Sequence, residues 1–474
     1  MTEAPRVAIR EIELSERPVR LRLPFRFGVV TLTECPQAFA RVRIEDAAGR
    51  SAWGAGAELM APKWFDKDLA LSNEDNFDQL RSVLLLAREA YLSDASPATA
   101  FAHFARHHDA HQAACAGRGY NPLLASYGPA LLDRAVLDAL CRLQGVSFYT
   151  AVREGLAGIG EARDEFRGLG LDRFLAGLQP PAQIEARHTV GLLDAVTAAD
   201  LGERVGDGLP ETLQEVIAAY GHRYFKLKVG GQVAADVARL SAIAAVLDAR
   251  PEPYFVSLDG NEQYESAEGV AELVAAIRAT PALARLWSSI LFIEQPIARK
   301  LALAADLRGA DLGKPVIIDE SDGELDSFVQ ARERGYSGVS SKTCKGLYKS
   351  ILNAARCAAW GPGYFMSAED LTTQAGLAVQ QDLALVNLLG IGHVERNGHH
   401  YVNGMAAWPE AEQEAFLQAH PDLYERSHGA VRLKIQGGRI ALRSLAGPGY
   451  ASGAWPDFSV NTALRSPTGA PRTL

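Results

Sequence analysis

The chain has few cysteines, and their positions match no structural motif. Its 474 residues include five cysteines, an odd number, and no two of them show the CxxC spacing typical of zinc-binding and redox motifs. A disulfide framework and a cysteine-based structural zinc site are therefore excluded. The cysteines are Cys35, Cys115, Cys141, Cys344 and Cys357.

Long apolar runs and an excess of basic residues are also absent. No apolar stretch approaches the roughly 18 residues that a membrane-spanning helix needs, and MTEAPRVAIREIEL lacks the apolar core of a signal peptide. Lys and Arg number 48 against 57 Asp and Glu, for a net charge of -9, which excludes a basic surface for nucleic acid or anionic lipid. We expect a cytoplasmic protein with a small-molecule partner and no nucleic-acid or membrane partner.

Residues 1–160 predict a small α+β domain. The runs VAIREIEL, AFARVRIED and SAWGAGAEL alternate apolar and polar residues and predict an antiparallel sheet between residues 5 and 60. Helical periodicity begins near Asn73, and PALLDRAVLDALCRLQG predicts a strong helix closed by Gly145. The following stretch, rich in Gly and Pro, marks a domain boundary.

Three histidines of this domain share one predicted helical face. His103, His107 and His111 are spaced four residues apart in FAHFARHHDAHQ. Such a set could hold a metal ion, but no acidic or cysteine ligand completes it. We interpret the segment as a polar surface helix.

Residues 181–404 predict a parallel (β/α)8-type barrel. Short β-rich runs recur there, and most of the intervals between them show a helical pattern. The competing doubly wound fold would need a GxGxxG turn after its first strand, and the sequence has none. The eight runs begin at Ile184, Tyr224, Tyr254, Ser289, Pro315, Gly338, Gly363 and Gly392.

Residues 405–465 predict a segment that returns to the N-terminal domain. A polar helical stretch precedes VRLKIQGGRIALRSLAGPGY, which predicts a hairpin of two strands joined by a Gly-Gly turn. A closed barrel offers no edge, so we expect these strands to join the N-terminal sheet. The predicted fold class is α/β: a barrel with an α+β domain made from two parts of the chain.

Two lysines occupy alternate positions of the second predicted barrel strand. Lys226 and Lys228, in FKLK, point to the same face of a strand. If that face points into the barrel, the two ammonium groups lower each other's pKa, and a lysine with a pKa of about 7 to 8 can take a proton from carbon. The alternative is a solvated edge strand, which a KxK pattern alone favours.

Carboxylates end three consecutive predicted strands. The strands end in LDGN, IEQP and IDES, which supply Asp259 with Asn261, then Glu294, then Asp319 with Glu320. Converging carboxylates repel one another unless a cation lies among them, and hard oxygen ligands favour Mg²⁺ over zinc. Each carboxylate alone could instead cap the following helix, but the set of three favours a metal site.

The sixth predicted strand ends in SSKTCKG and adds Lys342, with Lys345 close by. Strands two and six are four apart and lie across the mouth of a closed barrel. Lys228 and Lys342 would then flank a metal-bound molecule from opposite sides. This arrangement suits the removal of a proton from one face and its return to the other.

Taken together, these motifs resemble the enolase superfamily, and more closely its muconate-lactonizing-enzyme-like branch in the mandelate racemase/muconate lactonizing enzyme family. KLK, LDGN, IEQP, IDES and the KxxKG of SKTCKG match in order and spacing. RAVLDALCRLQG resembles the helix ahead of the barrel, and GRIALRSLAGPGY the closing strand and turn. The resemblance covers most of the chain.

The resemblance implies a role for each site residue. It implies one Mg²⁺, with Mn²⁺ as an alternative, held by Asp259, Glu294 and Asp319. It implies that Lys228 and Lys342 are the acid/base pair and that Lys226 is a partner for the substrate carboxylate. Asn261 and Glu320 would support the metal ligands. The N-terminal domain would cap the mouth, with RFGVVTLTE and AELMAPKW as specificity loops.

Two strand ends depart from known branches of the superfamily. Strand seven ends in SAED without the histidine of the mandelate-racemase branch, and strand eight, HVERNGHHY, lacks the acidic pair of dipeptide epimerases. A dipeptide substrate is therefore not implied. His399 and His400 in the latter segment either reach the pocket or are loop residues, and we favour loop residues.

The expected function is Mg²⁺-dependent abstraction of the proton α to a carboxylate, through a metal-stabilised enolate. Racemisation, epimerisation or cycloisomerisation of a small carboxylic acid would follow. The alternatives are β-elimination, as in a dehydratase, and a non-catalytic metal-binding homologue. A metal-dependent hydrolase would need histidine ligands, for which His188 is the lone candidate. We also expect a homo-oligomer.

Overall fold

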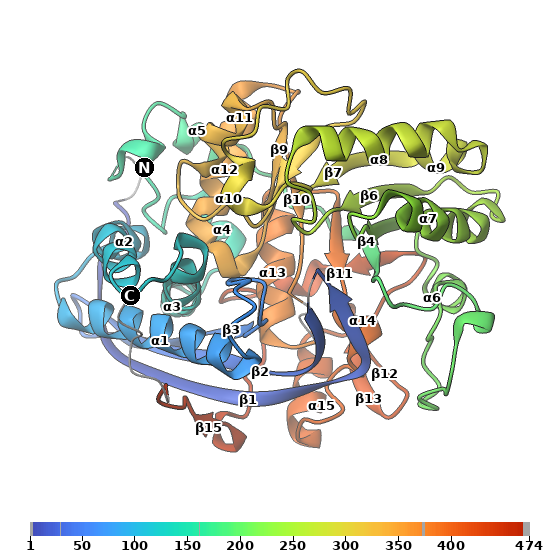
Figure 1. Ribbon diagram of the computed structural model, residues 1–474. Coiled ribbons are helices and arrows are strands. Elements are labelled where there is room, and N and C mark those ends of the chain that lie inside the picture. Colours follow the sequence, from blue (N-terminus) through green and yellow to red (C-terminus); the bar gives the residue numbers. More distant parts are fainter. Residues whose placement is uncertain (1–2, 29, 161, 372–374, 468–474) are drawn as a thin grey trace.

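Long antiparallel strands form the sheet of the N-terminal domain, here called the capping domain. The computed structural model describes the chain except residues 1–2, 29, 161, 372–374 and 468–474. The sheet has the order β15-β1-β2-β3 and curves along the lower left of the molecule in Figure 1. The antiparallel sheet expected between residues 5 and 60 is confirmed. Its strands are β1 (Val7–Phe27), β2 (Val30–Asp46), β3 (Ser51–Leu59) and β15 (Thr462–Ala463).

The helix α3, most of whose residues are buried, packs on this sheet. It ends at Gly145, whose φ of 67° is readily adopted only by glycine. The approach to β3 is close enough that a Cβ at Gly54 would lie 2.1 Å from the backbone nitrogen of Ala139. The helices of this region are α1 (Asn73–Ser93), α2 (Ala100–Ala116), α3 (Pro122–Gln144), α4 (Phe148–Arg153) and α5 (Leu171–Gly177).

The three histidines of α2 are buried, so their interpretation as a polar surface helix is wrong. His103 Nε2 lies 2.8 Å from the carbonyl oxygen of Val7, and His111 Nε2 lies 2.9 Å from that of Ala125. His107 packs against the ring of Tyr91. A buried imidazole is tolerated where its ring nitrogen is hydrogen-bonded, and these histidines pack α2 against its neighbours.

Eight parallel strands form the second sheet, in the order β10-β9-β8-β7-β6-β5-β4-β11. All the predicted runs are strands, and they begin within two residues of the predicted positions. The sheet is curled, and its terminal strands β10 and β11 are in contact. Among the described residues no ladder joins these two, so full closure stays a prediction. The strands are β4 (Gln183–Val190), β5 (Tyr224–Lys228), β6 (Phe255–Asp259), β7 (Ile290–Glu294), β8 (Val316–Ile318), β9 (Gly338–Ser341), β10 (Phe365–Ala368) and β11 (His393–Arg396).

Helices alternate with these strands and cover their outer face (Figure 1). Leu240, Ile243 and Leu247 of α7 are buried in the same apolar cluster as Phe225 and Leu227 of β5. Burial of such side chains supplies the main free energy of folding. The helices are α6 (Leu213–Tyr220), α7 (Val233–Asp248), α8 (Ala267–Ala279), α9 (Ala284–Ser289), α10 (Arg299–Ala302), α11 (Ser327–Glu333), α12 (Leu347–Trp360) and α13 (Leu377–Leu388).

The expected Gly-Gly turn is closed by an antiparallel bridge between Gln436 and Arg439, but the strands on either side of it do not pair with each other. β13 pairs with the strand before it, β12, whereas β14 pairs antiparallel with β4 of the barrel sheet. The first residues of β4, Gln183 and Ile184, precede its ladders with β5 and β11, and β14 takes up their free edge. The return to the capping sheet is made by β15 instead. The elements are α14 (Gly398–Tyr401), α15 (Glu410–Ala419), β12 (Tyr424–Ser427), β13 (Ala430–Leu433) and β14 (Arg439–Ala441).

The limits at residues 1–160, 181–404 and 405–465 stay predictions. All five cysteines are free thiols, in agreement with the absence of a disulfide framework. No helix in the described part of the chain has the length and apolar character that a membrane crossing requires.

A buried histidine near the C-terminus predicts loss of stability in acid. His420 Nε2 accepts a hydrogen bond from the Gly453 N–H at 2.9 Å, which requires the neutral imidazole. Burial lowers the pKa of His420 from 6.5 to about 4. Because the unfolded chain takes up this proton first, the free energy of unfolding falls as the pH drops from about 6.5 towards 4, by up to about 1.4 kcal/mol per pH unit.

Urea unfolding at several pH values checks this expectation. His420→Gln has no proton to take up, so its free energy of unfolding should depend less steeply on pH than that of the wild type below pH of about 6.5. At pH of about 7.5 the wild-type histidine is neutral and the difference in slope should vanish. Equal slopes in both proteins throughout would contradict the assignment.

Candidate metal centre and active site

Three carboxylates lie side by side at the carboxyl ends of adjacent strands. Asp259 and Glu294 are the last residues of β6 and β7 and are register partners, and Asp319 follows β8 directly. All three are fully buried. Parallel strands that run in one direction bring their ends to one edge, so the sequence correctly placed these residues together.

The turns after β6 and β7 hold this edge together. A Cβ at Gly260 would lie 2.6 Å from the Cα of Pro296, so the LDGN turn can approach the IEQP turn only with glycine there. The Gln295 side chain accepts hydrogen bonds from the backbone N–H groups of Asp319 (2.7 Å) and Ser321 (3.0 Å). These bonds join the end of β7 to the end of β8.

Lys226 lies at the centre of the site and contacts more carboxylates than predicted. Its Nζ lies within 3.1 Å of the oxygens of four buried acidic side chains. Two of the four were not among the predicted site residues: Glu369, which follows β10 directly, and Glu395 of β11. The distances are 2.8 Å to Asp259, 2.9 Å to Glu294, 2.8 Å to Glu369 and 3.1 Å to Glu395.

The signal for the two missed glutamates was in the sequence. Glu395 is next to last in β11 and Glu369 follows β10, positions equivalent to those that identified the other carboxylates. We interpreted SAED and HVER only for what they lacked. Arg187 forms an ion pair with Glu369, and the Thr189 hydroxyl donates to Glu395 at 2.5 Å. Both partners come from β4, on the face opposite His188.

Lys228 and Lys342 lie on opposite sides of the three carboxylates that are expected to bind the metal ion. Lys228 Nζ donates to Asp259 at 2.5 Å, and Lys342 Nζ donates to Asp319 at 2.5 Å. In the strand order, β5 with Lys228 and β9, which precedes Lys342, are separated by the strands that carry the three carboxylates. The structure therefore brings all the predicted catalytic and metal-binding side chains into one buried site.

The predicted direction of the lysine pKa shifts is wrong for Lys226. Burial disfavours its charged form, but the surrounding carboxylates, led by Asp259 and Glu294, outweigh burial and hold the pKa of Lys226 well above its usual value. For Lys342, burial is likewise outweighed by Asp319, and the pKa is raised. The expected lowering considered only the like charge of the neighbouring lysine, whereas four carboxylates surround the ammonium group of Lys226.

Lys345 and two further polar residues support the ligands. Lys345 Nζ lies 2.9 Å from Asp319 Oδ1 and donates to the Ser340 carbonyl oxygen. Asn261 has a φ of 38°, its backbone N–H donates to Asp259 at 2.9 Å, and its amide donates to Glu320 at 3.3 Å. Asn261 therefore contacts the expected metal ligand Asp259 directly, and Glu320 contacts Asn261.

The donor set fits a hard divalent cation. Glu294 Oε2 is buried and has no hydrogen-bond partner among the described residues. Burial, followed by the negative charges of Asp259 and Glu369, holds the pKa of Glu294 well above its usual value. A carboxylate with an unpartnered oxygen beside two other carboxylates is a ready oxygen ligand, and oxygen-only ligands suit Mg²⁺.

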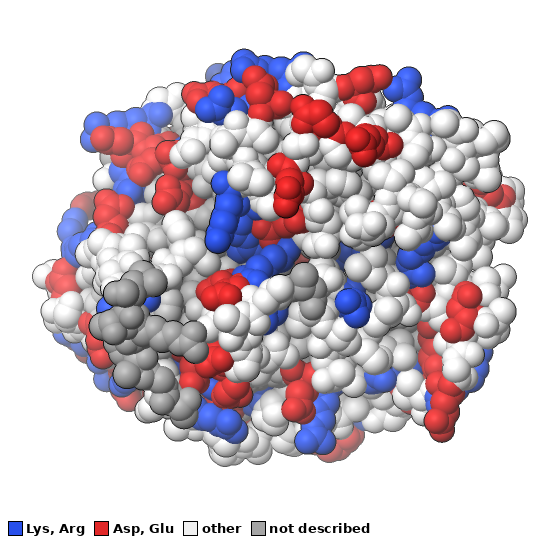
Figure 2. All heavy atoms as spheres, in the orientation of Figure 1, with Lys and Arg blue, Asp and Glu red and all other residues white. Residues whose placement is uncertain are grey.

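A cavity opens beside these residues, under the capping domain. Its polar wall includes Lys228 and Lys342, and its apolar wall comes from β1, β2, the segment after β3 and the segment after β10. Trp64 of the segment after β3 lies under Lys342, with Nζ 4.3 Å from the ring centre. Figure 2 shows charged atoms of both signs around a hollow in the middle of this face. The apolar lining comprises Phe25, Phe27, Leu32, Ala61, Trp64 and Leu371.

The two candidate specificity loops do contact this cavity. RFGVVTLTE contributes Phe27 and Leu32, and AELMAPKW contributes Ala61 and Trp64. His399 and His400 do not line it. They are buried in α14, so the interpretation as plain loop residues is wrong as well.

The fold and this constellation of carboxylates and lysines define an enolase-type enzyme scaffold. Residues 208–452, more than half of the chain, match the family described as enolase C-terminal domain-like. The chain therefore belongs to the enolase superfamily, in the family of mandelate racemase and muconate lactonizing enzyme. No curated protein matches the chain at a significant level.

Solved structures share the whole architecture at low identity. A muconate lactonizing enzyme from Mucobacterium smegmatis, complexed with muconolactone, is 18% identical, with 96% of this chain and 100% of that chain covered and a TM-score of 0.60. A dipeptide epimerase from Enterococcus faecalis V583, complexed with Mg and L-Leu-L-Tyr, is 13% identical, with 94% and 99% covered and a TM-score of 0.60. An enolase from Bradyrhizobium, complexed with magnesium and mandelic acid, is 17% identical, with 97% and 98% covered and a TM-score of 0.59. At such low identities, the structural similarity shows a shared fold and no more.

Proposed function

We propose that the protein abstracts the proton α to a carboxylate of a small organic acid, with Mg²⁺ as cofactor. One observation carries the proposal: Lys228 and Lys342 line the same cavity and stand on either side of three buried carboxylates. Neither packing nor solubility requires buried lysines paired with buried acids. Structural neighbours that bind Mg with mandelic acid or with a dipeptide support the same chemistry.

Asp259, Glu294 and Asp319 would hold the Mg²⁺. Bound there, the metal would supply positive charge that stabilises the enolate left when the α proton is removed. Asp319 is suited to remain ionised because Lys342 and Lys345 outweigh its burial and hold its pKa well below its usual value. Asn261 and Glu320 would keep the ligand side chains oriented.

Lys228 and Lys342 would exchange protons with the substrate carbon. Lys228 donates to Asp259 and Lys342 donates to Asp319. If these carboxylates bind the metal ion instead, the two lysine side chains are free to act on the substrate. Lys226 would remain charged among its carboxylates and partner the substrate carboxylate. If both flanking lysines exchange protons, racemisation or epimerisation results. If one only stabilises charge, cycloisomerisation or β-elimination results.

The cavity favours an acid with a compact apolar part. Its charged wall comes from the barrel strands, and Phe25, Phe27 and Trp64 of the capping domain face it. We infer a substrate whose carboxylate faces the lysines and whose distal group is apolar.

Hydrogen exchange in D₂O tests the proposal. The purified protein is incubated with a panel of small apolar carboxylic acids and Mg²⁺, and deuterium at the α carbon is followed by NMR. At least one acid should gain deuterium, and removal of Mg²⁺ with a chelator or the substitution Asp319→Asn should abolish the gain. The matched control is Lys300→Ala on the exposed face of α10, which should exchange at the wild-type rate.

The melting temperature separates the two main outcomes. Mg²⁺ should raise it in the wild type and not in Asp319→Asn, because a ligand that binds only the folded state stabilises that state. Stabilisation by Mg²⁺ without exchange of any acid would favour the non-catalytic homologue. No response to Mg²⁺ by either measurement would refute the metal site.

A further inference from the structure

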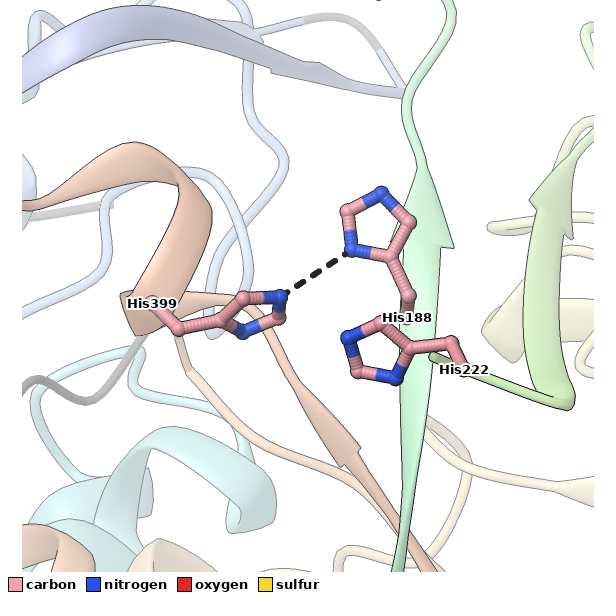
Figure 3. A group of neighbouring side chains, drawn as sticks. All are labelled: His188, His222 and His399. Carbon is pink, nitrogen blue, oxygen red and sulfur yellow. Dashed lines mark hydrogen bonds between the residues drawn. The ribbon is translucent and has the colours of Figure 1, made fainter. Parts of the chain in front are cut away.

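Three buried histidines converge outside the cavity. His188 comes from β4, His222 from the segment before β5, and His399 from α14. One ring nitrogen from each lies within 4.8 Å of the others, and Figure 3 shows the rings turned towards a common point. None of the three lines the cavity of the proposed active site.

The cluster lies on the other face of β4 from the active site. Successive side chains of a strand point to opposite faces, and Arg187 and Thr189 reach the acidic residues of the proposed active site. His188, between them, therefore points to the outer face of the sheet. There it meets His222 and His399, with ring centres 5.4 Å and 5.3 Å away.

The spacing of the nitrogens suits a tetrahedral metal ion. His188 Nδ1 and His399 Nε2 are 3.3 Å apart and share a hydrogen bond, which a bound metal ion would replace (Figure 3). Zinc bound to imidazole nitrogens at about 2.0–2.1 Å with tetrahedral angles holds those nitrogens about 3.4 Å apart. The His222 ring centre is 5.2 Å from that of His399, so the three rings form a nearly equilateral triangle.

The hydrogen bond made by His222 leaves its second ring nitrogen free to bind a ligand. His222 Nδ1 lies 2.9 Å from the carbonyl oxygen of Ala186, a contact that requires the Nδ1–H tautomer. Its Nε2 is then an acceptor, and it is buried without a partner among the described residues. A histidine that donates one nitrogen to a backbone carbonyl and offers the other is typical of metal ligands.

The surroundings keep the three imidazoles neutral. Burial lowers the pKa of all three, to about 4 for His222. Arg432, which donates to the carbonyl oxygen of His399, adds positive charge nearby and acts in the same direction. Only neutral imidazole binds a metal ion, and imidazole selects zinc and its transition-metal neighbours over Mg²⁺.

We propose that His188, His222 and His399 form a second metal site for one divalent transition-metal ion, with Zn²⁺ or Co²⁺ as the probe. The ligand atoms are His188 Nδ1, His222 Nε2 and His399 Nε2, and the fourth position takes a water molecule or an added ligand. Such an ion would join β4, α14 and the entry to β5.

Cobalt provides the test, because tetrahedral Co²⁺ absorbs strongly in visible light and Mg²⁺ does not. The full-length protein is stripped with a chelator, saturated with Mg²⁺ and titrated with Co²⁺. We expect one tightly bound equivalent with a tetrahedral spectrum, and Asp319→Asn should bind it equally. His222→Ala and His399→Ala should each lose it.

The control is His107→Ala. His107 is also buried and its Nε2 also lacks a hydrogen-bond partner among the described residues, but it belongs to α2 of the capping domain. This variant should bind Co²⁺ as the wild type does. X-ray absorption on the zinc-loaded wild type should show imidazole nitrogens at about 2.0 Å and needs no variant.

Three results would overturn the proposal. One is a wild-type protein that shows no tetrahedral Co²⁺ and no zinc with imidazole ligands under saturating Mg²⁺. Another is a tetrahedral spectrum that survives in both His222→Ala and His399→Ala. Loss of the signal in Asp319→Asn, with retention in the histidine variants, would also refute it by assigning the ion to the carboxylates.

Discussion

Replacement of Lys228 by alanine is expected to slow α-proton exchange by about 10²- to 10⁴-fold, the usual contribution of a general base. The lysine lines the cavity and contacts only Asp259 among the acidic site residues. Its loss should therefore leave Mg²⁺ binding in place. The measurement is the rate of deuterium incorporation in D₂O, with the Mg²⁺-induced rise in melting temperature measured on the same variant.

Lys342→Ala is the informative companion. If both lysines exchange protons, each variant should lose exchange of one enantiomer and the protein is a racemase or epimerase. If Lys228→Ala alone loses exchange, Lys342 serves only to hold charge, and the two-base mechanism is excluded. Wild-type exchange in Lys228→Ala would contradict the role assigned to this residue.

Replacement of Lys226 by methionine is expected to lower the free energy of unfolding by about 3–5 kcal/mol. The substitution removes the single cation that contacts Asp259, Glu294, Glu369 and Glu395, all of them buried. Lys228 and Arg187 still pair with Asp259 and Glu369, but Glu294 and Glu395 keep no ion pair among the described residues, and the four buried carboxylates repel one another more strongly. Urea unfolding at neutral pH, without divalent cations, measures the effect.

Two comparisons separate this electrostatic cost from a packing defect. Mg²⁺ should recover part of the lost stability of Lys226→Met, because a cation among the carboxylates replaces the missing charge. The exposed substitution Lys300→Met should change the free energy of unfolding by no more than about 0.5 kcal/mol. A Lys226→Met protein as stable as the wild type would show that the carboxylates are neutral or otherwise paired.

The order of the elements could be predicted because it depends on local pattern. Alternation of short apolar runs with helical periodicity identified all the strands from β4 to β11. The pairing of β14 with β4 could not be predicted in this way. It depends on which residues of β4 extend beyond their neighbours, and that register forms only when the sheet assembles.

Lys226 also has one feature that local sequence predicts and another that depends on the folded structure. Its position in FKLK, two residues before Lys228, predicted that both side chains share one face. Its pKa depends on the sum of charges around Nζ, and two of the four acids there, Glu369 and Glu395, come from strands more than 140 residues further along the chain. Local sequence therefore predicts where Lys226 lies, whereas the direction of its pKa shift depends on residues distant along the chain.

The sequence by itself determined which strands carry polar side chains at their carboxyl ends, because chain direction and a period of two follow from local geometry. From this came Asp259, Glu294, Asp319 and the two flanking lysines. Only the tertiary structure decided what surrounds each ammonium and imidazole group. Electrostatic interactions and metal coordination depend on distances through space, and residues such as His188, His222 and His399 carry no common pattern along the chain.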